Sequence, residues 1–314
     1  MTSLLEIRQL AKSYGDRRVV DSLSFSLEAG EVFGLLGPNG AGKSTTMMMI
    51  CGILDADAGE VLFDGQPLQT HRPESRSQLG VVPQDLAIYP EMTAAENLNF
   101  FASLYGLKGQ VRADSVERAL DQVGLTARAN DHAGTFSGGM KRRLNFAAAV
   151  LHSPRLLILD EPTVGVDPQS RAHLLDCIRS LRATGTSVIY ASHYMEEVEA
   201  ICQRAAIIDH GNLLASDTIP ALLSQIPQEV QVCVTSTLVA EQIALPSGST
   251  IETRGDTSVI HITAKKDLAD QGVPELASLL GQLRDHEIGV TAIRTLEPNL
   301  ERLFLKLTGH RLRD

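Results

Sequence analysis

The segment GPNGAGKST has the residue types and spacing of a loop that holds a phosphate group. Gly37 is followed by four residues and then by Gly42, Lys43 and Ser44, which is the phosphate-loop pattern. Glycines let backbone N–H groups turn inward around a β-phosphate, and a following helix N-terminus adds its positive dipole. Lys43 would bridge the β- and γ-phosphates, and Ser44 would ligate Mg²⁺. The positions expected to contact a nucleotide are Gly37, Pro38, Asn39, Gly40, Ala41, Gly42, Lys43, Ser44 and Thr45.

Two adjacent acids, Asp160 and Glu161, end the apolar run LLIL at residues 156–159. Unpaired buried charge is costly, so two carboxylates at the end of a buried strand need a partner. Asp160 suits a hold on Mg²⁺, and Glu161 suits a general base that orients an attacking water. Alternatively, both acids are solvated at a strand end. The phosphate loop in the same chain favours the catalytic interpretation.

The surrounding pattern predicts the elements that position these residues. Residues 32–36 read as a short buried strand that runs into the glycine loop, and the residues after Lys43 read as a helix. Residues 156–159 and 187–191 read as buried strands, each followed by helix-like sequence. Such alternation predicts a mostly parallel sheet that is covered by helices on both faces.

Flanking segments have a different character. Alternation of apolar and polar residues over 4–10 and 19–27 predicts antiparallel strands, and residues 205–215 read as a hairpin. The stretch from about 85 to 151 reads as mostly helical, with Thr93 and Glu96 as a capping box. We therefore expect a first domain over residues 1–226 with a helical insertion.

Beyond residue 227 the alternation of strand-like and helix-like segments begins again, which predicts a small second α/β domain over 227–314. Its expected elements are a strand over 229–234, a helix, strands over 250–253 and 259–262, a long helix from Pro274, a strand over 290–295 and a last helix from Pro298. Each nucleotide motif occurs once in the chain.

Composition narrows the function classes. The 314 residues carry a formal net charge of −10, contain no Trp and are only 4% aromatic, which argues against a nucleic-acid partner. The longest apolar runs fall far short of the roughly 20 residues that a membrane span needs, and the N-terminus has no signal-peptide pattern. We expect a cytoplasmic chain whose membrane role comes through a partner. The four cysteines lack metal-ligand spacing and read as buried free thiols.

The turn at Phe136-Ser137-Gly138-Gly139-Met140 lies between the phosphate loop and the acidic strand. By itself, a Gly-Gly turn is only a turn. With its flanks, it resembles the signature loop of ATP-binding cassette (ABC) transporter ATPases, and a Ser hydroxyl with glycine N–H groups at a helix N-terminus makes a second anion site. In that family the two sites face each other across a dimer. The resemblance implies that Ser137, Gly138 and Gly139 of one copy close on an ATP held by the other.

Four further positions match the family pattern over about 220 residues in all. Tyr14 resembles the residue that stacks on adenine, and Gln84 resembles the glutamine that senses Mg²⁺ and the attacking water. Asp167 resembles the loop that crosses to the partner copy. His193 resembles the switch histidine that contacts the γ-phosphate, and it follows a predicted strand, where ligands bind in open α/β sheets.

The family resemblance implies an α/β phosphate-loop fold of ABC type, with ATP and Mg²⁺ as cofactors. It also implies a homodimer of ATP-binding subunits and a separate integral-membrane permease with several transmembrane helices, which would hold the chain at the cytoplasmic side of the cell membrane. The ending LEPNLERLFLKLTGHRLRD resembles ATPase subunits of bacterial drug- and antibiotic-resistance exporters of the type-two group.

Two other functions stay open at this point. One is a non-transport ABC ATPase that acts on ribosomes or nucleic acid, although such proteins usually carry two cassettes or a coiled coil. The other is the ATPase subunit of an importer, which shares the nucleotide motifs. A GTPase or small-molecule kinase would leave the Ser137–Gly139 turn unexplained, and a GTPase would need a base-reading Asn-Lys-x-Asp motif, which is absent from the sequence.

Overall fold

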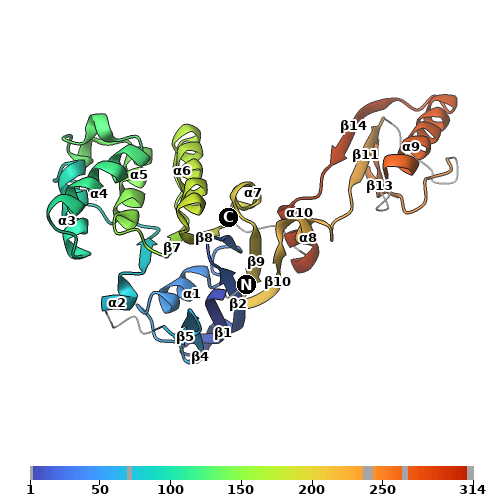
Figure 1. Cartoon of the computed structure of the whole chain (residues 1–314). Coiled ribbons are helices and arrows are strands. Elements are labelled where there is room, and N and C mark those ends of the chain that lie inside the picture. Colours follow the sequence, from blue (N-terminus) through green and yellow to red (C-terminus); the bar gives the residue numbers. More distant parts are fainter. Residues whose placement is uncertain (1–2, 69–72, 236–242, 264–267, 310–314) are drawn as a thin grey trace. The chain divides into compact units, whose positions relative to one another are not determined.

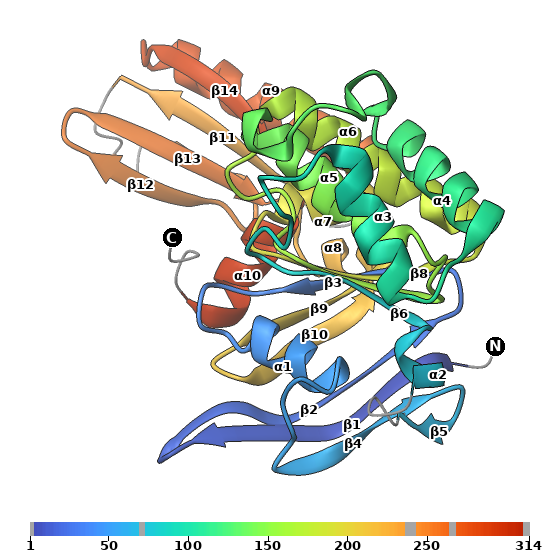
Figure 2. The ribbon, with the colours of Figure 1, turned by 90° about the vertical axis from the view of Figure 1, so that its left-hand side faces the viewer.

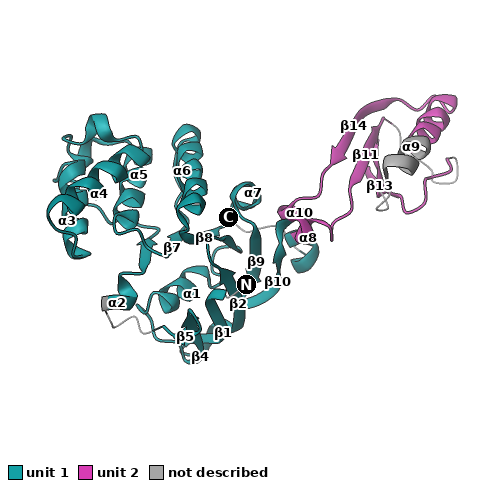
Figure 3. Ribbon diagram, in the orientation of Figure 1, with its two compact units in different colours: residues 1–219, 304–314 teal, residues 220–303 magenta. Residues whose placement is uncertain are grey.

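The computed structural model describes residues 3–68, 73–235, 243–263 and 268–309 (Figure 1). The chain divides into two compact units, 1–219 with 304–314 and 220–303 (Figure 3). The first unit contains the phosphate loop, the acidic strand and the Ser-Gly-Gly turn. The predicted domains, 1–226 and 227–314, concern independent folding and stay a prediction.

The central sheet of the first unit is mostly parallel, which confirms the predicted fold class. Its described strands are Val32–Leu36 (β3), Leu79–Val82 (β6), Leu156–Asp160 (β7), Ser187–Ser192 (β8), Arg204–Asp209 (β9) and Asn212–Thr218 (β10). They run in the order β10-β9-β3-β8-β7-β6, and β10 pairs antiparallel to β9. Strands β3 and β8 are buried along their whole length, as is expected where helices cover both faces of a parallel sheet.

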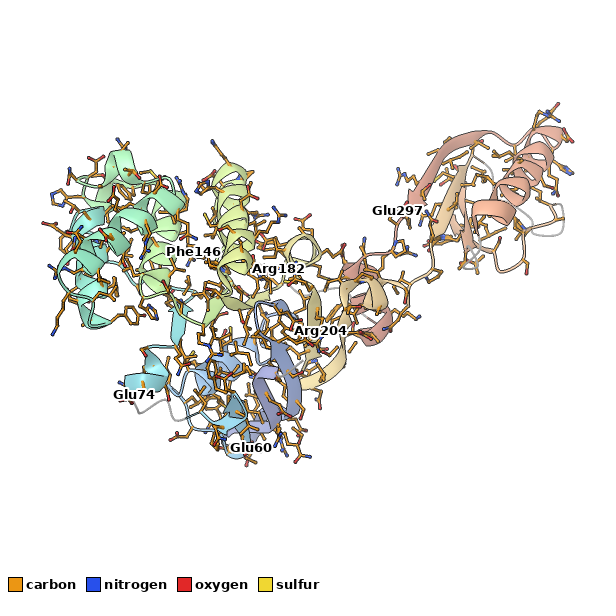
Figure 4. All side chains as sticks on the ribbon, in the orientation of Figure 1. Glu60, Glu74, Phe146, Arg182, Arg204 and Glu297 are labelled. Carbon is orange, nitrogen blue, oxygen red and sulfur yellow. The ribbon has the colours of Figure 1, made fainter. Side chains whose placement is uncertain are left out.

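A second, antiparallel sheet packs in the same unit. Its strands are Ser3–Tyr14 (β1), Arg17–Glu28 (β2), Ala58–Phe63 (β4) and Gln66–Pro67 (β5), in the order β2-β1-β4-β5. Helix α1 (Lys43–Ile50) lies between the two sheets (Figure 2). One hydrophobic core joins them, with Phe25 of β2 stacked on Phe33 of β3 at 5.1 Å between ring centroids. The guanidinium of Arg204 lies 5.5 Å from the Phe33 ring centroid and pairs with Glu31. Figure 4 labels Arg204 among the side chains of the first unit.

The predicted helical insertion is confirmed. Its longer helices are Ala94–Leu104 (α3), Gly109–Gln122 (α4) and Gly138–Val150 (α5), preceded by the short Pro73–Arg76 (α2). The predicted capping box is present: Thr93 Oγ1 accepts from Glu96 N, and Glu96 Oε2 accepts from Thr93 N. Helices Pro168–Leu181 (α6) and Met195–Ile201 (α7) follow β7 and β8, in the expected strand–helix order.

The second unit is an antiparallel sheet with a helix packed on it. Its described strands are Glu229–Val234 (β11), Thr250–Arg254 (β12), Thr257–Thr263 (β13) and Val290–Leu296 (β14), in the order β12-β13-β11-β14. Helix Leu268–Asp285 (α9) contributes Leu279 and Leu283 to a core with Val232 and Ile260. Proline is favoured at a first helical position, yet α9 begins before Pro274, so the predicted start was wrong. The helix expected after β11 falls largely outside the described residues.

Two short helices flank this second unit along the chain, Ile219–Leu223 (α8) and Leu300–Thr308 (α10). A last helix was predicted from Pro298, and α10 begins two residues later; its Leu300, Leu303 and Phe304 are all buried. Gly309 follows α10 with a positive φ of 77°, the left-handed conformation in which glycine commonly ends a helix.

Candidate active site at the phosphate loop

The phosphate loop runs from the end of β3 into α1, and its glycines are required by their surroundings. A Cβ atom on Gly37 would lie 2.3 Å from the carbonyl oxygen of Ile208, and one on Gly42 would lie 2.7 Å from that of Val19. Gly42 also has φ of 102°, a conformation that other residues rarely adopt. The loop is therefore fixed by close backbone packing rather than by side chains.

The turn of the β9–β10 hairpin is hydrogen bonded to this loop. This contact was not predicted from the sequence. Gly211 N donates to Ala41 O at 3.0 Å, and Asp21 N donates to Gly211 O at 2.9 Å. His210 and Gly211 have φ of 47° and 79°, as a two-residue hairpin turn demands. The sequence indicated this turn, but nothing in the local pattern revealed that its glycine faces the phosphate loop.

Lys43 is buried and already fully paired within the chain. Its Nζ donates to Gly37 O at 2.8 Å and to Pro38 O at 3.1 Å, and it lies 3.2 Å from Glu161 Oε1. Burial lowers the pKa of Lys43, and the attraction of Glu161 opposes that shift. The two loop carbonyls thus hold the ammonium at the position where a bound phosphate would compete for it.

Glu161 turns sharply out of β7 and joins two predicted catalytic residues. Its φ is 47°, an uncommon conformation for a side-chain-bearing residue, and its N–H donates to Ala191 O at 3.0 Å. Its Oε1 lies 3.1 Å from Nδ1 of His193 as well as 3.2 Å from Lys43 Nζ. The fold therefore places Lys43, Glu161 and His193 in one chain of contacts.

Sheet register explains why these three residues meet. Leu36 at the end of β3 pairs with Ser192, and Asp160 at the end of β7 pairs with Ala191. Strands β3, β8 and β7 are parallel neighbours in the sheet, so their carboxyl ends lie at one edge of it. This edge is where open α/β sheets bind ligands.

Asp160 and Ser44 supply oxygen atoms that fit a Mg²⁺ site. The Ser44 hydroxyl hydrogen bonds to the Asp160 side chain, while the buried Oδ1 of Asp160 has no hydrogen-bond partner. Burial raises the pKa of Asp160, and the bond from Ser44 opposes that shift. Among the described residues no group of three or more His, Cys, Asp or Glu side chains could hold a metal. Mg²⁺ is usually bound by few protein oxygens together with substrate phosphates, so this donor set suits it.

Tyr14 and Gln84 lie outside the buried cluster. Tyr14 ends β1 with half of its surface exposed, which leaves its ring available for stacking. Gln84 follows β6 on the surface, and its carbonyl oxygen accepts a hydrogen bond from Arg142 of α5. Sequence reasoning missed Arg142, although the basic run after the Ser-Gly-Gly turn was the signal that could have found it. Through this bond the Gln84 segment is tied to α5, the helix that begins after Ser137.

The Ser137 loop forms the N-terminus of α5. Ser137 Oγ accepts from Met140 N at 3.3 Å, so the hydroxyl caps the helix, and both Ser137 and Gly138 are exposed. Gly139 is buried, and a Cβ there would lie 2.2 Å from Ser170 Oγ. Within the described ranges, no hydrogen bond or ion pair joins this loop to the phosphate loop.

Asp167 lies beside the Ser137 loop in the same chain. It caps α6 by accepting from Ser170 N at 2.9 Å, and this bond lowers the pKa of Asp167. A Cβ on Gly139 would lie 2.7 Å from Asp167 Oδ2. The structure thus brings the predicted site residues into two groups, one around Lys43 and one around Ser137 and Asp167.

A phosphate loop entering a helix from a parallel sheet, with an acidic strand beside it, defines a phosphate-loop ATPase. A family model described as "ABC transporter" matches residues 20–164. The chain is 45% identical to the linearmycin resistance ATP-binding protein LnrL of Bacillus subtilis, over 99% of this chain and 100% of that protein. It is 36% identical to a Nod factor export ATP-binding protein I of Cupriavidus metallidurans, over 100% of each chain.

A solved structure of an ATP-binding subunit of an ABC transporter is also similar. It is 30% identical with a TM-score of 0.65, and the match covers 71% of this chain and 93% of that one. The chain belongs to the ABC transporter family, and it is an ATP-binding and ATP-hydrolysing subunit that works with a membrane permease. None of the helices in the described ranges has the length and apolar character needed to span a membrane.

Proposed function

We propose that this chain drives a separate exporter permease by closing as a homodimer around two Mg²⁺-bound ATP molecules. The observation that carries this proposal is the contact chain of Lys43, Glu161 and His193 at the carboxyl edge of the sheet. These residues supply a cation, a base and an imidazole in direct contact. That combination suits in-line attack of water on a terminal phosphate.

In the proposed cycle, ATP competes with Glu161 and two loop carbonyls for the Lys43 ammonium. Once Lys43 turns to the phosphates, the Glu161 carboxylate is free to accept a proton from the attacking water. His193, already within 3.1 Å of Glu161, orients this carboxylate and reaches toward the γ-phosphate. Ser44, Asp160 and Gln84 would hold Mg²⁺, which neutralises phosphate charge when bound. Tyr14 would stack on adenine.

The homodimer is proposed because the Ser137 loop offers a second anion site. Ser137, whose hydroxyl caps α5, and Gly138, the first residue of that helix, are exposed at the helix N-terminus, and Gly139 is buried behind them. The neighbouring Asp167 lies on the same surface loop cluster. A second copy would bring its own phosphate loop to this cluster, so that each ATP is held by Lys43 of one copy and Ser137 of the other.

The permease is proposed to bind at the helical insertion, which places the subunit peripherally on the cytoplasmic side of the membrane. Tyr89, Phe100 and Phe101 form an aromatic cluster with Tyr89 in edge contact with Phe100, and Leu86 and Leu104 are exposed nearby in sequence. Export is the proposed direction because the similar proteins are named for resistance and for Nod factor export.

The test uses the full chain with Glu161→Gln, which should bind Mg²⁺ and ATP but hydrolyse slowly. Light scattering should report twice the monomer mass with saturating ATP and the monomer mass without it. The control is the same variant with Lys43→Ala added, which should stay monomeric at the ATP concentration that just saturates Glu161→Gln, because loss of the ammonium weakens ATP binding. A monomer at every ATP concentration, with ATP binding intact, would overturn the homodimer.

The domain division at residues 226 and 227 is a separate proposal. It rests on the restart of strand and helix patterning after that point and on the separate core around Val232 and Leu279. A fragment of residues 1–226 should unfold in one cooperative transition and still bind ATP. An insoluble fragment would move the boundary, because residues 304–314 group with the first unit.

A further inference from the structure

A buried carboxylate outside the phosphate site connects the segments that carry the catalytic side chains. Glu197 of α7 has only 3% of its side chain exposed. Its Oε2 accepts from Tyr190 OH at 2.6 Å and from Thr163 Oγ1 at 2.9 Å, and Ser192 Oγ lies at 3.4 Å. Its Oε1 lies 3.3 Å from Nε of Arg171, as an ion pair.

Each partner stands next to a residue of the proposed site. Thr163 comes two positions after Glu161, and Ser192 directly precedes His193. Arg171 lies in the first turns of α6, and its N–H donates to the carbonyl of Asp167 at 2.9 Å. One carboxylate therefore meets the turn after β7, the end of β8 and the helix that Asp167 caps.

A second set of contacts leads from the same network to His193. The Arg171 guanidinium carbon lies 4.9 Å from the centroid of the Tyr194 ring, and that centroid lies 4.1 Å from the His193 ring. Tyr194 N donates to Ser192 Oγ at 2.9 Å. The imidazole is thus confined both by its backbone neighbour and by a ring that Arg171 covers.

Burying a carboxylate costs free energy, because the charge is removed from water. Replacing a buried ion pair by apolar groups of similar volume is often neutral or stabilising, so stability alone does not require Glu197. We infer that Glu197 is a positioning residue for ATP hydrolysis, which fixes the Glu161 turn and the His193 ring relative to each other and to α6. This inference rests on the proposed roles of Glu161 and His193.

Glu197→Gln tests it in the full chain, because the amide keeps the volume and an acceptor oxygen but loses the ion pair with Arg171. We expect kcat for ATP to fall roughly ten- to hundredfold, as for loss of a charge-assisted contact, with KM within about twofold. Glu196→Gln is the matched control: this neighbour on α7 is 81% exposed and lies 4.0 Å from Arg171. It should leave kcat unchanged.

A double-mutant cycle separates positioning from simple loss of stability. In a His193→Ala background, Glu197→Gln should cost little further rate, because residues that act as a unit are not additive. Fully additive losses, or a wild-type kcat for Glu197→Gln, would overturn the inference. If Glu197→Gln does not fold, Tyr190→Phe removes one hydroxyl from the same carboxylate and should lower kcat several-fold at unchanged KM; an unchanged kcat overturns the inference.

The proposed function fails in a different way. If His193→Ala and Glu161→Gln both hydrolyse ATP at the wild-type rate, the roles of these residues are wrong and Glu197 has nothing to position. If both are slow while Glu197→Gln and Tyr190→Phe are fast, only the positioning role is wrong.

Discussion

The Lys43 site and the Ser137 loop both lie at helix N-termini and are both proposed anion sites, yet they are built differently. Around Lys43 the ammonium and the Glu161 carboxylate are buried and paired with each other, and two loop carbonyls also accept hydrogen bonds from the ammonium. Around Ser137 the groups are exposed, and the hydroxyl has only the backbone of its own helix as a partner. The first site is organised within one chain, whereas the second is open toward whatever approaches it.

This contrast has a physical consequence for how each site responds to mutation. When the partner of a buried polar group is removed, the protein loses stability by the full desolvation penalty of that group. An exposed group instead replaces the lost hydrogen bond with one to water. Substitutions in the Lys43 group should therefore have large effects on chemistry. Substitutions in the Ser137 group should have smaller effects, which depend on a second copy.

The largest expected effect comes from Glu161→Gln. Loss of a general base typically costs between about 10²- and 10⁴-fold in rate, so phosphate release should fall by that factor while ATP still binds. Steady-state phosphate release and fluorescent-nucleotide binding, measured on one preparation, separate these two outcomes. Hydrolysis within a few-fold of wild type would mean that Glu161 is not the general base. It would also contradict the expectation that substitutions in the Lys43 group have the larger effects.

Lys43→Ala is next in size and acts on binding rather than on chemistry alone. A charge-assisted hydrogen bond contributes about 1.5–3 kcal/mol, so ATP affinity should fall roughly 10- to 150-fold. Lys108→Ala is the control, since Lys108 is an exposed lysine before α4. Titration calorimetry measures both variants. Equal ATP affinities for Lys43→Ala and wild type would mean that the buried ammonium belongs to the fold and not to the ligand.

Much of the Lys43 group could be predicted from sequence, because its residues lie in short motifs at strand ends. The strand ending at Leu36 and the acidic strand ending at Asp160 were readable from apolar runs, and parallel strands align their carboxyl ends. The contact between Glu161 and His193 follows from that alignment once the strand order is known. The strand order itself was not readable, because neighbouring strands in the sheet are far apart in the chain.

Contacts between side chains or loops that are far apart in the chain could not be predicted from local sequence patterns. Gly211 braces the phosphate loop, and Arg142 holds the Gln84 carbonyl. Glu197 read as one acid in an acidic helix, with nothing to distinguish it from its exposed neighbour Glu196. Burial decides between these two glutamates, and burial depends on tertiary packing of α7 against α6 and β8.

In the Ser137 region, two adjacent glycines make a matched pair. A Cβ on Gly139 would lie 2.4 Å from Ser170 Cβ, whereas one on Gly138 would meet only Gly165 O at 3.9 Å. Gly139→Ala should therefore destabilise the chain by about 1–3 kcal/mol, as overpacking does, and Gly138→Ala by less. Thermal unfolding of the two variants without nucleotide tests this. Equal melting temperatures would show that the loop is not anchored on α6.

Ser137→Ala should have a smaller effect on hydrolysis, about tenfold, because a hydrogen bond from an exposed hydroxyl to the phosphate anion lies at the low end of the range for charged groups, about 1.5 kcal/mol. Mixing two variants tests whether Ser137 acts on the ATP that is bound by the other copy. Ser137→Ala mixed with Lys43→Ala forms heterodimers in which one site keeps both wild-type halves. The mixture should hydrolyse ATP faster than the mean of the two variants alone. Strict additivity would mean that each chain works by itself.

The smallest expected effect is on the pH dependence of stability, which should have opposite signs for Asp160 and Asp167. Burial raises the pKa of Asp160, so its ionised form costs folding free energy at neutral pH, and that cost disappears as pH falls below the ordinary aspartate value. Hydrogen bonding lowers the pKa of Asp167, so its ionised form adds stability above the ordinary value, and that gain is lost as pH falls through the lowered pKa.

Asp160→Asn should therefore raise the free energy of unfolding at neutral pH by an amount on the order of 1 kcal/mol or less, which appears as a higher melting temperature, and the gain should vanish in acid. Asp167→Asn keeps a capping side chain but loses the charge, so it should lower the melting temperature at neutral pH and match wild type in acid. Melting curves of the nucleotide-free chain between neutral and acidic pH give both trends. Parallel trends would mean that the two carboxylates share one kind of environment, because only a buried, under-paired acid and an exposed, capped acid give opposite slopes.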